Sequence, residues 1–151
     1  MDLSADGKEI EKIIVSQEQI QSRLKELAAQ IVKDYEGKDL ILVGVLKGAI
    51  MAMADLSRYL QRHVDMDWMA VTSYGAGTKS SGVVRILKDL DNDILGREVL
   101  IVEDILDTGL TLSWLTENLL SRGAKSVSVF TVLRKPDAAT VKVEAKYVGF
   151  D

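Results

Sequence analysis

The 151-residue chain contains no cysteine and only one histidine. Without cysteine, disulfides, thiolate metal sites and cysteine nucleophiles are all excluded, and the composition suits a reducing compartment such as the cytoplasm. A Ser-His-Asp triad or a multi-histidine metal site would have to be built around His63 alone. That residue lies in the polar segment QRHVD, so we expect an exposed connector and assign it no catalytic role.

The chain also lacks an excess of positive charge, with a formal net charge of -4. We therefore expect small molecules or proteins as partners, and neither nucleic acid nor a membrane. The N-terminus, MDLSADGKEIEKI, has no basic segment followed by an apolar core, so no secretory signal is expected. Residues 40–56 are apolar enough to suggest a membrane span, but Lys47 and two glycines favour strand, turn and helix. The length predicts one domain over 1–151, located in the cytoplasm.

Apolar periodicity along the chain predicts alternating helices and strands. Ser16 and Gln19 form a capping-box pattern, and apolar residues follow at helical spacing, which predicts a helix over 16–36. Later segments predict strands at 39–46, 64–71, 83–90, 99–102, 127–133 and 145–151, with helices over 49–60 and around 112–119. This alternation is typical of an α/β fold with a mostly parallel open sheet flanked by helices.

Two of the predicted strands, 64–71 and 83–90, are joined by a loop containing SYGAGTKSSG. Because the loop is rich in Gly, Ser and Thr, we expect a β-hairpin with a flexible tip. Ligands of open α/β sheets bind beyond the carboxyl ends of the strands. The turns at 47–48, 103–111 and 134–136 should therefore lie together on one edge of the sheet.

The segment VLIVEDILDTGLT, residues 99–111, places a Gly/Thr turn before a helix and three carboxylates beside it. Helix-start amides and two hydroxyls can wrap a monophosphate, here with residues Asp107, Thr108, Gly109, Leu110 and Thr111. The carboxylates of Glu103 and Asp104 would repel that phosphate, so they need another target. Vicinal hydroxyls and a divalent cation such as Mg²⁺ both suit them. A ribose 5-phosphate carrying a metal-bound pyrophosphate offers all of these groups.

Each of these residues also has an ordinary structural explanation. Asp107 could simply stabilise a helix dipole, a common role worth under about 1 kcal/mol. Glu103 and Asp104 could be a solvated strand end, and Gly109 could be only a turn. The ordered set on one strand, turn and helix is much less expected by chance.

The segment VLIVEDILDTGLTL resembles the phosphoribosyl pyrophosphate (PRPP) signature of type I phosphoribosyltransferases, and the rest resembles the hypoxanthine-guanine branch of that family. The matching segments are VLKGA at 45–49, SYGAGTKSSGVVRILKDLD at 73–91, LRKPDA at 133–138 and YVGFD at 147–151. The resemblance covers nearly the whole chain. It implies the type I phosphoribosyltransferase fold and transfer of the 5-phosphoribosyl group of PRPP to hypoxanthine or guanine, giving IMP or GMP and pyrophosphate.

The resemblance also implies roles for individual residues. Glu103 and Asp104 would address the ribose hydroxyls, directly or through metal-bound water, and 107–111 would bind the 5-phosphate. Asp107 would also be the general base that takes a proton from the purine ring. The family implies Mg²⁺ as cofactor, PRPP and a 6-oxopurine as substrates, and a homo-oligomer, either a dimer or a tetramer.

Further roles follow from the other matching turns. Lys47 and the Gly48 amide would hold pyrophosphate, in a turn where the family often has a cis peptide before the lysine. Ser73 and Tyr74 would belong to a lid that closes over the site, and an ordinary flexible hairpin is the alternative. Lys135 would donate to the 6-oxo group, since lysine has donors and no acceptor; alternatively it is a solvated strand-end lysine. For Lys47 we favour a bound anion over an ammonium that merely reaches the surface.

The family normally continues past YVGFD with residues that stack on and read the purine, so we expect this domain to be C-terminally incomplete. Its purine preference among hypoxanthine, guanine and xanthine stays open. The alternative on the same fold is a noncatalytic PRPP-binding regulator, against which acidic net charge argues. A phosphoacceptor receiver domain also ends a strand with an acidic pair. Such domains place the pair on their first strand, whereas here 98 residues precede Val99.

Overall fold

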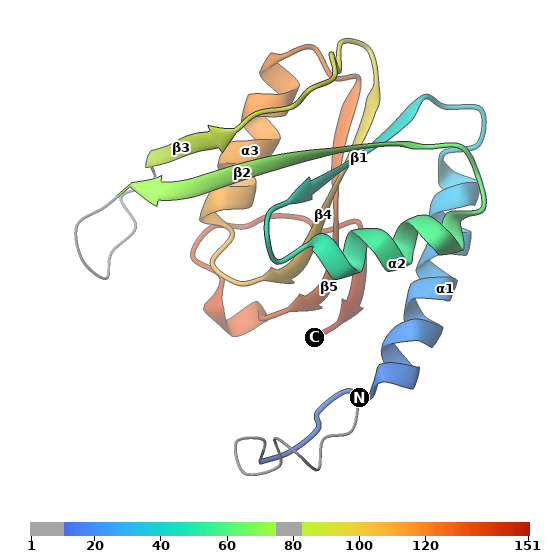
Figure 1. Cartoon of the computed structure of the whole chain (residues 1–151). Coiled ribbons are helices and arrows are strands. Elements are labelled where there is room, and N and C mark those ends of the chain that lie inside the picture. Colours follow the sequence, from blue (N-terminus) through green and yellow to red (C-terminus); the bar gives the residue numbers. More distant parts are fainter. Residues whose placement is uncertain (1–10, 75–82) are drawn as a thin grey trace.

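A computed structural model describes residues 11–74 and 83–151 of the chain. Three helices are interspersed among six strands along these residues, with one short 3₁₀ turn near the C-terminus (Figure 1). In chain order they are α1 (Gln17–Asp34), β1 (Leu40–Val45), α2 (Ile50–Leu60), β2 (Asp65–Tyr74), β3 (Val83–Lys88), β4 (Glu98–Leu106), α3 (Leu110–Ser121), β5 (Ser126–Arg134), η1 (Pro136–Ala138) and β6 (Tyr147–Phe150). Among the described residues, no helix is both long and apolar enough to cross a membrane.

All six strands form one sheet in the order β3-β2-β1-β4-β5-β6. Every neighbouring pair is parallel except β2 and β3, which form the predicted antiparallel hairpin. The expected mostly parallel α/β sheet is therefore confirmed. The hairpin tip, residues 75–82, lies outside the described residues, so its flexibility stays a prediction.

The helices cover both faces of the sheet, and each face has its own core. On one face α1 and α2 pack on the central strands. Leu27 of α1, Met53 of α2 and Phe130 of β5 belong to this core. On the other face α3 packs through Leu112, Leu115 and Leu119. The buried strand β1 contributes alternate side chains to both cores, which explains its continuous apolar sequence.

Local sequence signals explain where several elements begin. The Ser16 side chain accepts from the Gln19 amide, and the Gln19 side chain accepts from the Ser16 amide, so the predicted capping box is present. By contrast, β2 runs three residues past the predicted end, to Tyr74. Its last residues pair with β3 even though the alternating apolar pattern has stopped, because antiparallel pairing needs backbone groups and not a particular side chain.

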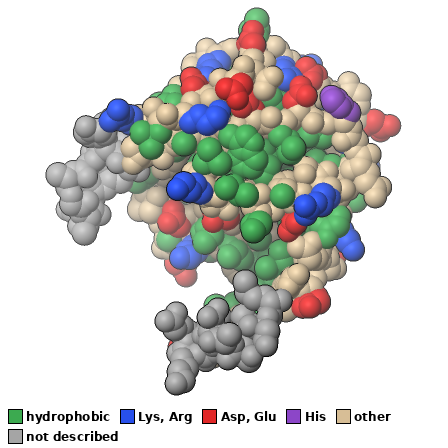
Figure 2. Space-filling model, in the orientation of Figure 1, with side chains coloured by type: hydrophobic (Ala, Val, Ile, Leu, Met, Phe, Trp, Pro, Cys, Tyr) green, Lys and Arg blue, Asp and Glu red, His purple; other side chains and the backbone are tan. Residues whose placement is uncertain are grey.

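One part of the sheet surface is not covered by a helix. Figure 2 shows hydrophobic side chains gathered over β2 and α2. Met66 of β2 is 48% exposed, and Ile50 and Met51 of α2 are 45% and 77% exposed. The polar residue His63 is also exposed. Its side chain is 94% exposed, as expected of a connector.

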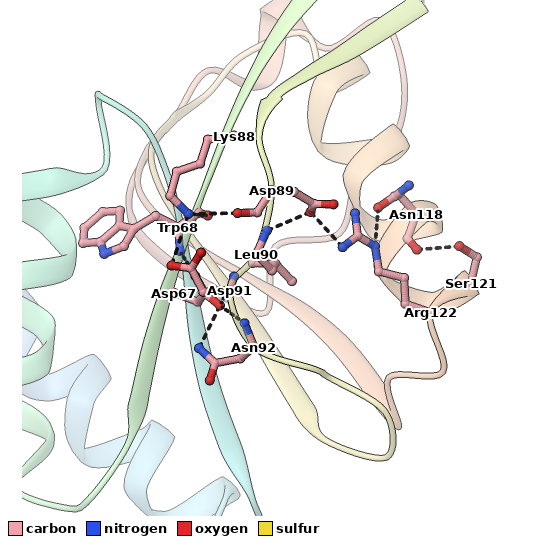
Figure 3. Close-up of polar contacts among 10 residues, drawn as sticks. All are labelled: Asp67, Trp68, Lys88, Asp89, Leu90, Asp91, Asn92, Asn118, Ser121 and Arg122. Atoms are coloured by element: carbon pink, nitrogen blue, oxygen red, sulfur yellow. Dashed lines mark hydrogen bonds and ion pairs between the residues drawn. The ribbon is translucent and has the colours of Figure 1, made fainter.

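A buried carboxylate ties β2 to the loop that follows β3 (Figure 3). Asp67 is only 2% exposed, and its carboxylate accepts from the Trp68 amide through one oxygen. The other oxygen accepts from the Asp91 amide, the Asn92 amide and the Asn92 side chain at 2.9–3.0 Å. Burial alone would raise the pKa of Asp67, but these donors hold it below the ordinary value. The loop is held further by the ion pair of Asp89 with Arg122 of α3.

We predict that Asp67→Asn lowers the free energy of unfolding by about 2–4 kcal/mol, because an amide nitrogen would replace an oxygen that only donors surround. Urea unfolding at pH 7 measures the change. Asp91→Asn is the matched control, since that side chain is exposed and, within residues 11–74 and 83–151, pairs only with Lys88. Equal losses in the two variants would contradict the role given to Asp67.

The same contact predicts a pH dependence. A carboxyl whose pKa is lowered by folding stabilises the native state above its unfolded pKa of about 4, and the contribution disappears as pH falls through the native pKa. The difference in unfolding free energy between wild type and Asp67→Asn should therefore shrink below about pH 4. A difference that stays constant from pH 7 to pH 3 would contradict this reasoning.

Candidate active site

The acidic pair lies inside a strand, which corrects the sequence-based expectation that the strand stops before it. β4 continues through Glu103 and Asp104 to Leu106. The strand continues because its backbone keeps pairing with β5, with Glu103 opposite Thr131 and Leu106 opposite Arg134. Strand geometry then places Glu103 and Asp104 on opposite faces of the sheet. Their side chains start on opposite faces, but the two carboxyl groups come close enough at this strand end for Asp104 to raise the pKa of Glu103.

Asp104 lies directly against the turn that follows β1. A Cβ atom built on Gly48 would be 2.6–2.8 Å from the three atoms of the Asp104 carboxyl group, so a larger residue would require that side chain to move. The peptide bond between Leu46 and Lys47 in the same turn is cis, as the family resemblance implies. The structure thus brings together the turn at 47–48 and the acidic pair, two segments that sequence reasoning placed on one edge.

Lys47 is exposed, although it interrupts an apolar segment of the sequence. We expected that an ammonium group at this position would be buried and would destabilise the protein unless an anion was bound. That expectation is wrong, because water solvates the group. Its proposed role in binding pyrophosphate now rests on its position beside Gly48 and Asp104, and not on burial.

The turn at 107–111 lines a cavity of about 190 Å³ beside Glu103. Gly109 has φ 81°, a left-handed conformation that favours glycine, and it caps α3 without a side-chain hydrogen bond. Within the turn, the Thr108 amide donates to the Asp107 carboxylate at 2.6 Å. Across residues 11–74 and 83–151, no acceptor is found for the Gly109 amide. The cavity therefore meets the unpaired start of a helix, which suits an anion.

Glu103 lines the same cavity and is largely withdrawn from water. Burial raises the pKa of its carboxyl to about 8, and the nearby carboxylates of Asp104 and Asp107 act in the same direction. In the apoprotein the protonated form of Glu103 is therefore favoured at neutral pH. A group that donates hydrogen bonds or carries positive charge would stabilise the carboxylate here.

Glu103 and Asp104 are also the residues that could ligate a metal ion at this site. Among the described residues, no group of three or more His, Cys, Asp or Glu side chains could hold a metal ion. Glu103 and Asp104 supply two neighbouring carboxylates at most. They fit a Mg²⁺ ion that takes its other ligands from substrate and water, as this ion commonly does.

Lys135 follows β5 directly, beside the phosphate turn. Its backbone amide donates to the carbonyl of Leu106 at 2.9 Å, so Lys135 is fixed to the residue before Asp107. Asp107 and Lys135 line one cavity of about 460 Å³, while Asp107 also lines the smaller cavity next to Glu103. Asp107, the first residue of the turn at 107–111, therefore borders both cavities.

Sequence reasoning missed Ile105, which lies between the acids and Asp107. Its side chain is 39% exposed although it is apolar and sits in a strand. It lines an apolar cavity of about 510 Å³ together with Gly48, Asp104 and Leu133. The signal in the sequence was a pair of apolar residues, Ile105 and Leu106, between carboxylates, of which strand alternation lets only one, the buried Leu106, reach the core.

Ser73 and Tyr74 are the last residues of β2, and their backbones pair with Val84 and Val83. The rest of the predicted lid, residues 75–82, lies outside the described residues. Its closure over the site stays a prediction.

Known proteins resemble the chain in sequence and in structure. The family model "Phosphoribosyl transferase domain" matches residues 12–151. A hypoxanthine-guanine phosphoribosyltransferase of Mycobacterium bovis is 54% identical over 149 residues, covering 95% of this chain and 74% of that protein. One from Streptococcus thermophilus is 50% identical, covering 95% and 80%. The crystal structure of a Staphylococcus aureus hypoxanthine phosphoribosyltransferase superposes with a TM-score of 0.95 at 45% identity, covering 99% of this chain and 82% of that one.

The extent of these matches and the site geometry agree. The strand-end turns that resemble the family signature lie on one edge of the observed sheet, in a fold shared with solved members. The chain belongs to the phosphoribosyltransferase family.

Proposed function

We propose that the chain transfers the 5-phosphoribosyl group of PRPP to a 6-oxopurine, hypoxanthine or guanine, with release of pyrophosphate. The observation that carries this proposal is the meeting of three turns. Asp104 packs on Gly48, Glu103 shares a cavity with residues 107–111, and the Lys135 backbone is bonded to Leu106. An activated sugar phosphate and a base can therefore be held side by side at this edge.

The phosphate end of PRPP would be held mainly by backbone groups. The amides at the start of α3, together with the hydroxyls of Thr108 and Thr111, surround the cavity beside Glu103. Amides that have no intrahelical partner bind a phosphate well because the helix dipole adds positive partial charge. The other end of PRPP, its pyrophosphate, would lie at the turn of Lys47 and Gly48.

The sugar would lie between these two ends, with its hydroxyls donating to Glu103 and Asp104. A Mg²⁺ ion bound with PRPP would neutralise charge on the departing pyrophosphate. The raised pKa of Glu103 supports a ligand that brings hydroxyl donors or a cation, because either group stabilises the carboxylate form.

The purine would lie near Ile105 and Lys135, which offer an apolar surface and a hydrogen-bond donor. Lys135 donates to the 6-oxo oxygen and cannot accept from the 6-amino group of adenine. As the purine nitrogen bonds to the anomeric carbon and the bond to pyrophosphate breaks, the purine ring loses a proton. Asp107, which stands between the two cavities, is the group placed to accept it.

The proposal includes the expected setting of the enzyme. By resemblance to the family we expect a cytoplasmic protein that forms a homo-oligomer. The exposed apolar face over β2 and α2 supports self-association, because large exposed apolar patches mark interaction surfaces.

The direct experiment adds PRPP, Mg²⁺ and each of hypoxanthine, guanine, xanthine and adenine to the protein and follows nucleotide formation. We expect product with hypoxanthine or guanine and none with adenine. Calorimetric binding of PRPP without product from any base would instead favour a noncatalytic regulator. No binding of PRPP would reject the proposal.

We predict that Asp107→Asn lowers turnover at least about 100-fold while PRPP affinity stays within about threefold, because the amide keeps the shape but cannot accept the proton. Steady-state rates and calorimetry with PRPP measure the two effects. Asp137→Asn, on the exposed 3₁₀ turn, is the control. Unchanged turnover would reject Asp107 as the base.

For Lys135→Ala we expect at least about tenfold weaker purine binding, because the charged donor to the 6-oxo group is lost. PRPP affinity should change by less than about twofold. Lys125→Ala is the control, since Lys125 is also exposed and lies before β5, outside the lining of the cavity that Lys135 shares with Asp107. Equal losses of purine and PRPP affinity would show that the lysine has another role.

Glu103→Gln should stabilise the apoprotein at pH 8 by roughly 1–4 kcal/mol while weakening PRPP binding. A carboxyl whose pKa rises from 4.5 to about 8 on folding destabilises the native state progressively as pH increases over that range. Chemical unfolding at pH 5 and pH 8 measures this, and the gain should be small at pH 5. Glu36→Gln, an exposed position, should show no gain at either pH. The same gain at both pH values would contradict the assigned cause.

A further inference from the structure

A second segment holds the phosphate turn from outside the cavity. We name residues 139–143, which follow the turn of Lys135, the strap. The carbonyl of Thr108 accepts from the Thr140 amide at 3.0 Å, from the Val141 amide at 3.1 Å and from the Thr140 hydroxyl at 3.3 Å. Three donors on one carbonyl fix its direction.

The strap also closes over the glycine of the turn. A Cβ atom built on Gly109 would be 2.6 Å from the Val141 carbonyl oxygen and 3.1 Å from a methyl group of Val143. Gly109 is buried although it belongs to a surface turn. The backbone of the strap therefore occupies the space beside Gly109 that any larger residue would need.

The direction of the Thr108 carbonyl determines that of the Gly109 amide. The one cis peptide within residues 11–74 and 83–151 precedes Lys47, so the bond between Thr108 and Gly109 is trans. In a planar trans peptide the C=O and the following N–H point in opposite directions. A carbonyl held toward the strap therefore turns the Gly109 N–H away from the strap, toward the cavity that Gly109 lines.

We infer that the strap, through the amides of Thr140 and Val141, is a positioning element that aims the Gly109 amide at the phosphate of the bound sugar. This inference rests on the proposed function and deepens it. Without the strap, the peptide could rotate so that its carbonyl oxygen faces the phosphate and repels it. The strap thus prepares the anion site before the ligand arrives.

The test removes one donor from the strap. Val141→Pro lacks the amide that bonds Thr108, Val141→Ala keeps it, and Lys142→Pro places a proline at a neighbouring position that has no bond to Thr108. Calorimetry with ribose 5-phosphate probes the phosphate turn, and calorimetry with pyrophosphate probes the separate turn at 47–48. We expect Val141→Pro to weaken ribose 5-phosphate binding at least about tenfold and to leave pyrophosphate binding within about twofold, with both controls like wild type.

Several outcomes would overturn the inference. One is that Val141→Pro binds ribose 5-phosphate with wild-type affinity. Another is that Val141→Pro loses affinity for ribose 5-phosphate and for pyrophosphate equally. A third is that Lys142→Pro shows the same selective loss of ribose 5-phosphate affinity. Wild-type protein that binds neither ribose 5-phosphate nor PRPP would reject the proposed function itself.

A second pair of variants gives an answer even if Val141→Pro does not fold. Thr140→Val removes only the hydroxyl donor and should weaken ribose 5-phosphate binding about two- to fivefold, while Thr140→Ser keeps the donor and should restore it. The Gly109 amide resonance reports directly: inorganic phosphate should shift it in wild type and Thr140→Ser, and less in Thr140→Val. Identical shifts in all three proteins would count against the strap.

Discussion

The hydrogen-bond ladder between β4 and β5 extends beyond the buried core, and the whole site depends on that extension. Pairing continues at Glu103, Ile105 and Leu106, and the Lys135 amide adds one more bond to Leu106. The acids, the start of the phosphate turn and the purine-side lysine are thereby fixed to one rigid pair of strands. Were the ladder to end with the apolar run at Val102, each would belong to a separate loop.

The rigid strand holds the acidic side chain of Glu103 in a position that is unfavourable for the stability of the fold. Glu103 is held largely out of water with carboxylates on either side, and its pKa rises to about 8 as a result. Thr131, opposite it in β5, is fully buried, and its hydroxyl donates to the Leu133 carbonyl at 2.8 Å. The hydroxyl of this facing residue is thus engaged by backbone carbonyls and is not recorded donating to Glu103. The acid is left available for a ligand, at a cost in stability.

Local signals in the sequence were sufficient for most of the fold, whereas the roles predicted for the acids and for the turn at 107–111 stay predictions. The capping box at Ser16 and the buried run of β1 depend on neighbours in the sequence, so they could be predicted. The contact of Asp104 with Gly48 and the exposure of Lys47 depend on how distant segments pack. The role of the strap could not be predicted either. It depends on how distant segments pack and on backbone amides, which do not depend on the side chain of the residue.

In the proposed function the two halves of the site differ in construction, because backbone groups would hold the phosphate and side chains would hold the purine. The phosphate side is mostly backbone: amides at the start of α3, a glycine in a left-handed conformation, and a carbonyl held by the strap. The purine side is mostly side chain, with Ile105 and Lys135 projecting from fixed strand ends. Under the proposed function, substitutions on the purine side would alter which base is accepted and would leave the backbone that holds the sugar phosphate unchanged. Since the strap follows Lys135 directly, insertions or deletions between residues 135 and 140 would disturb both halves at once.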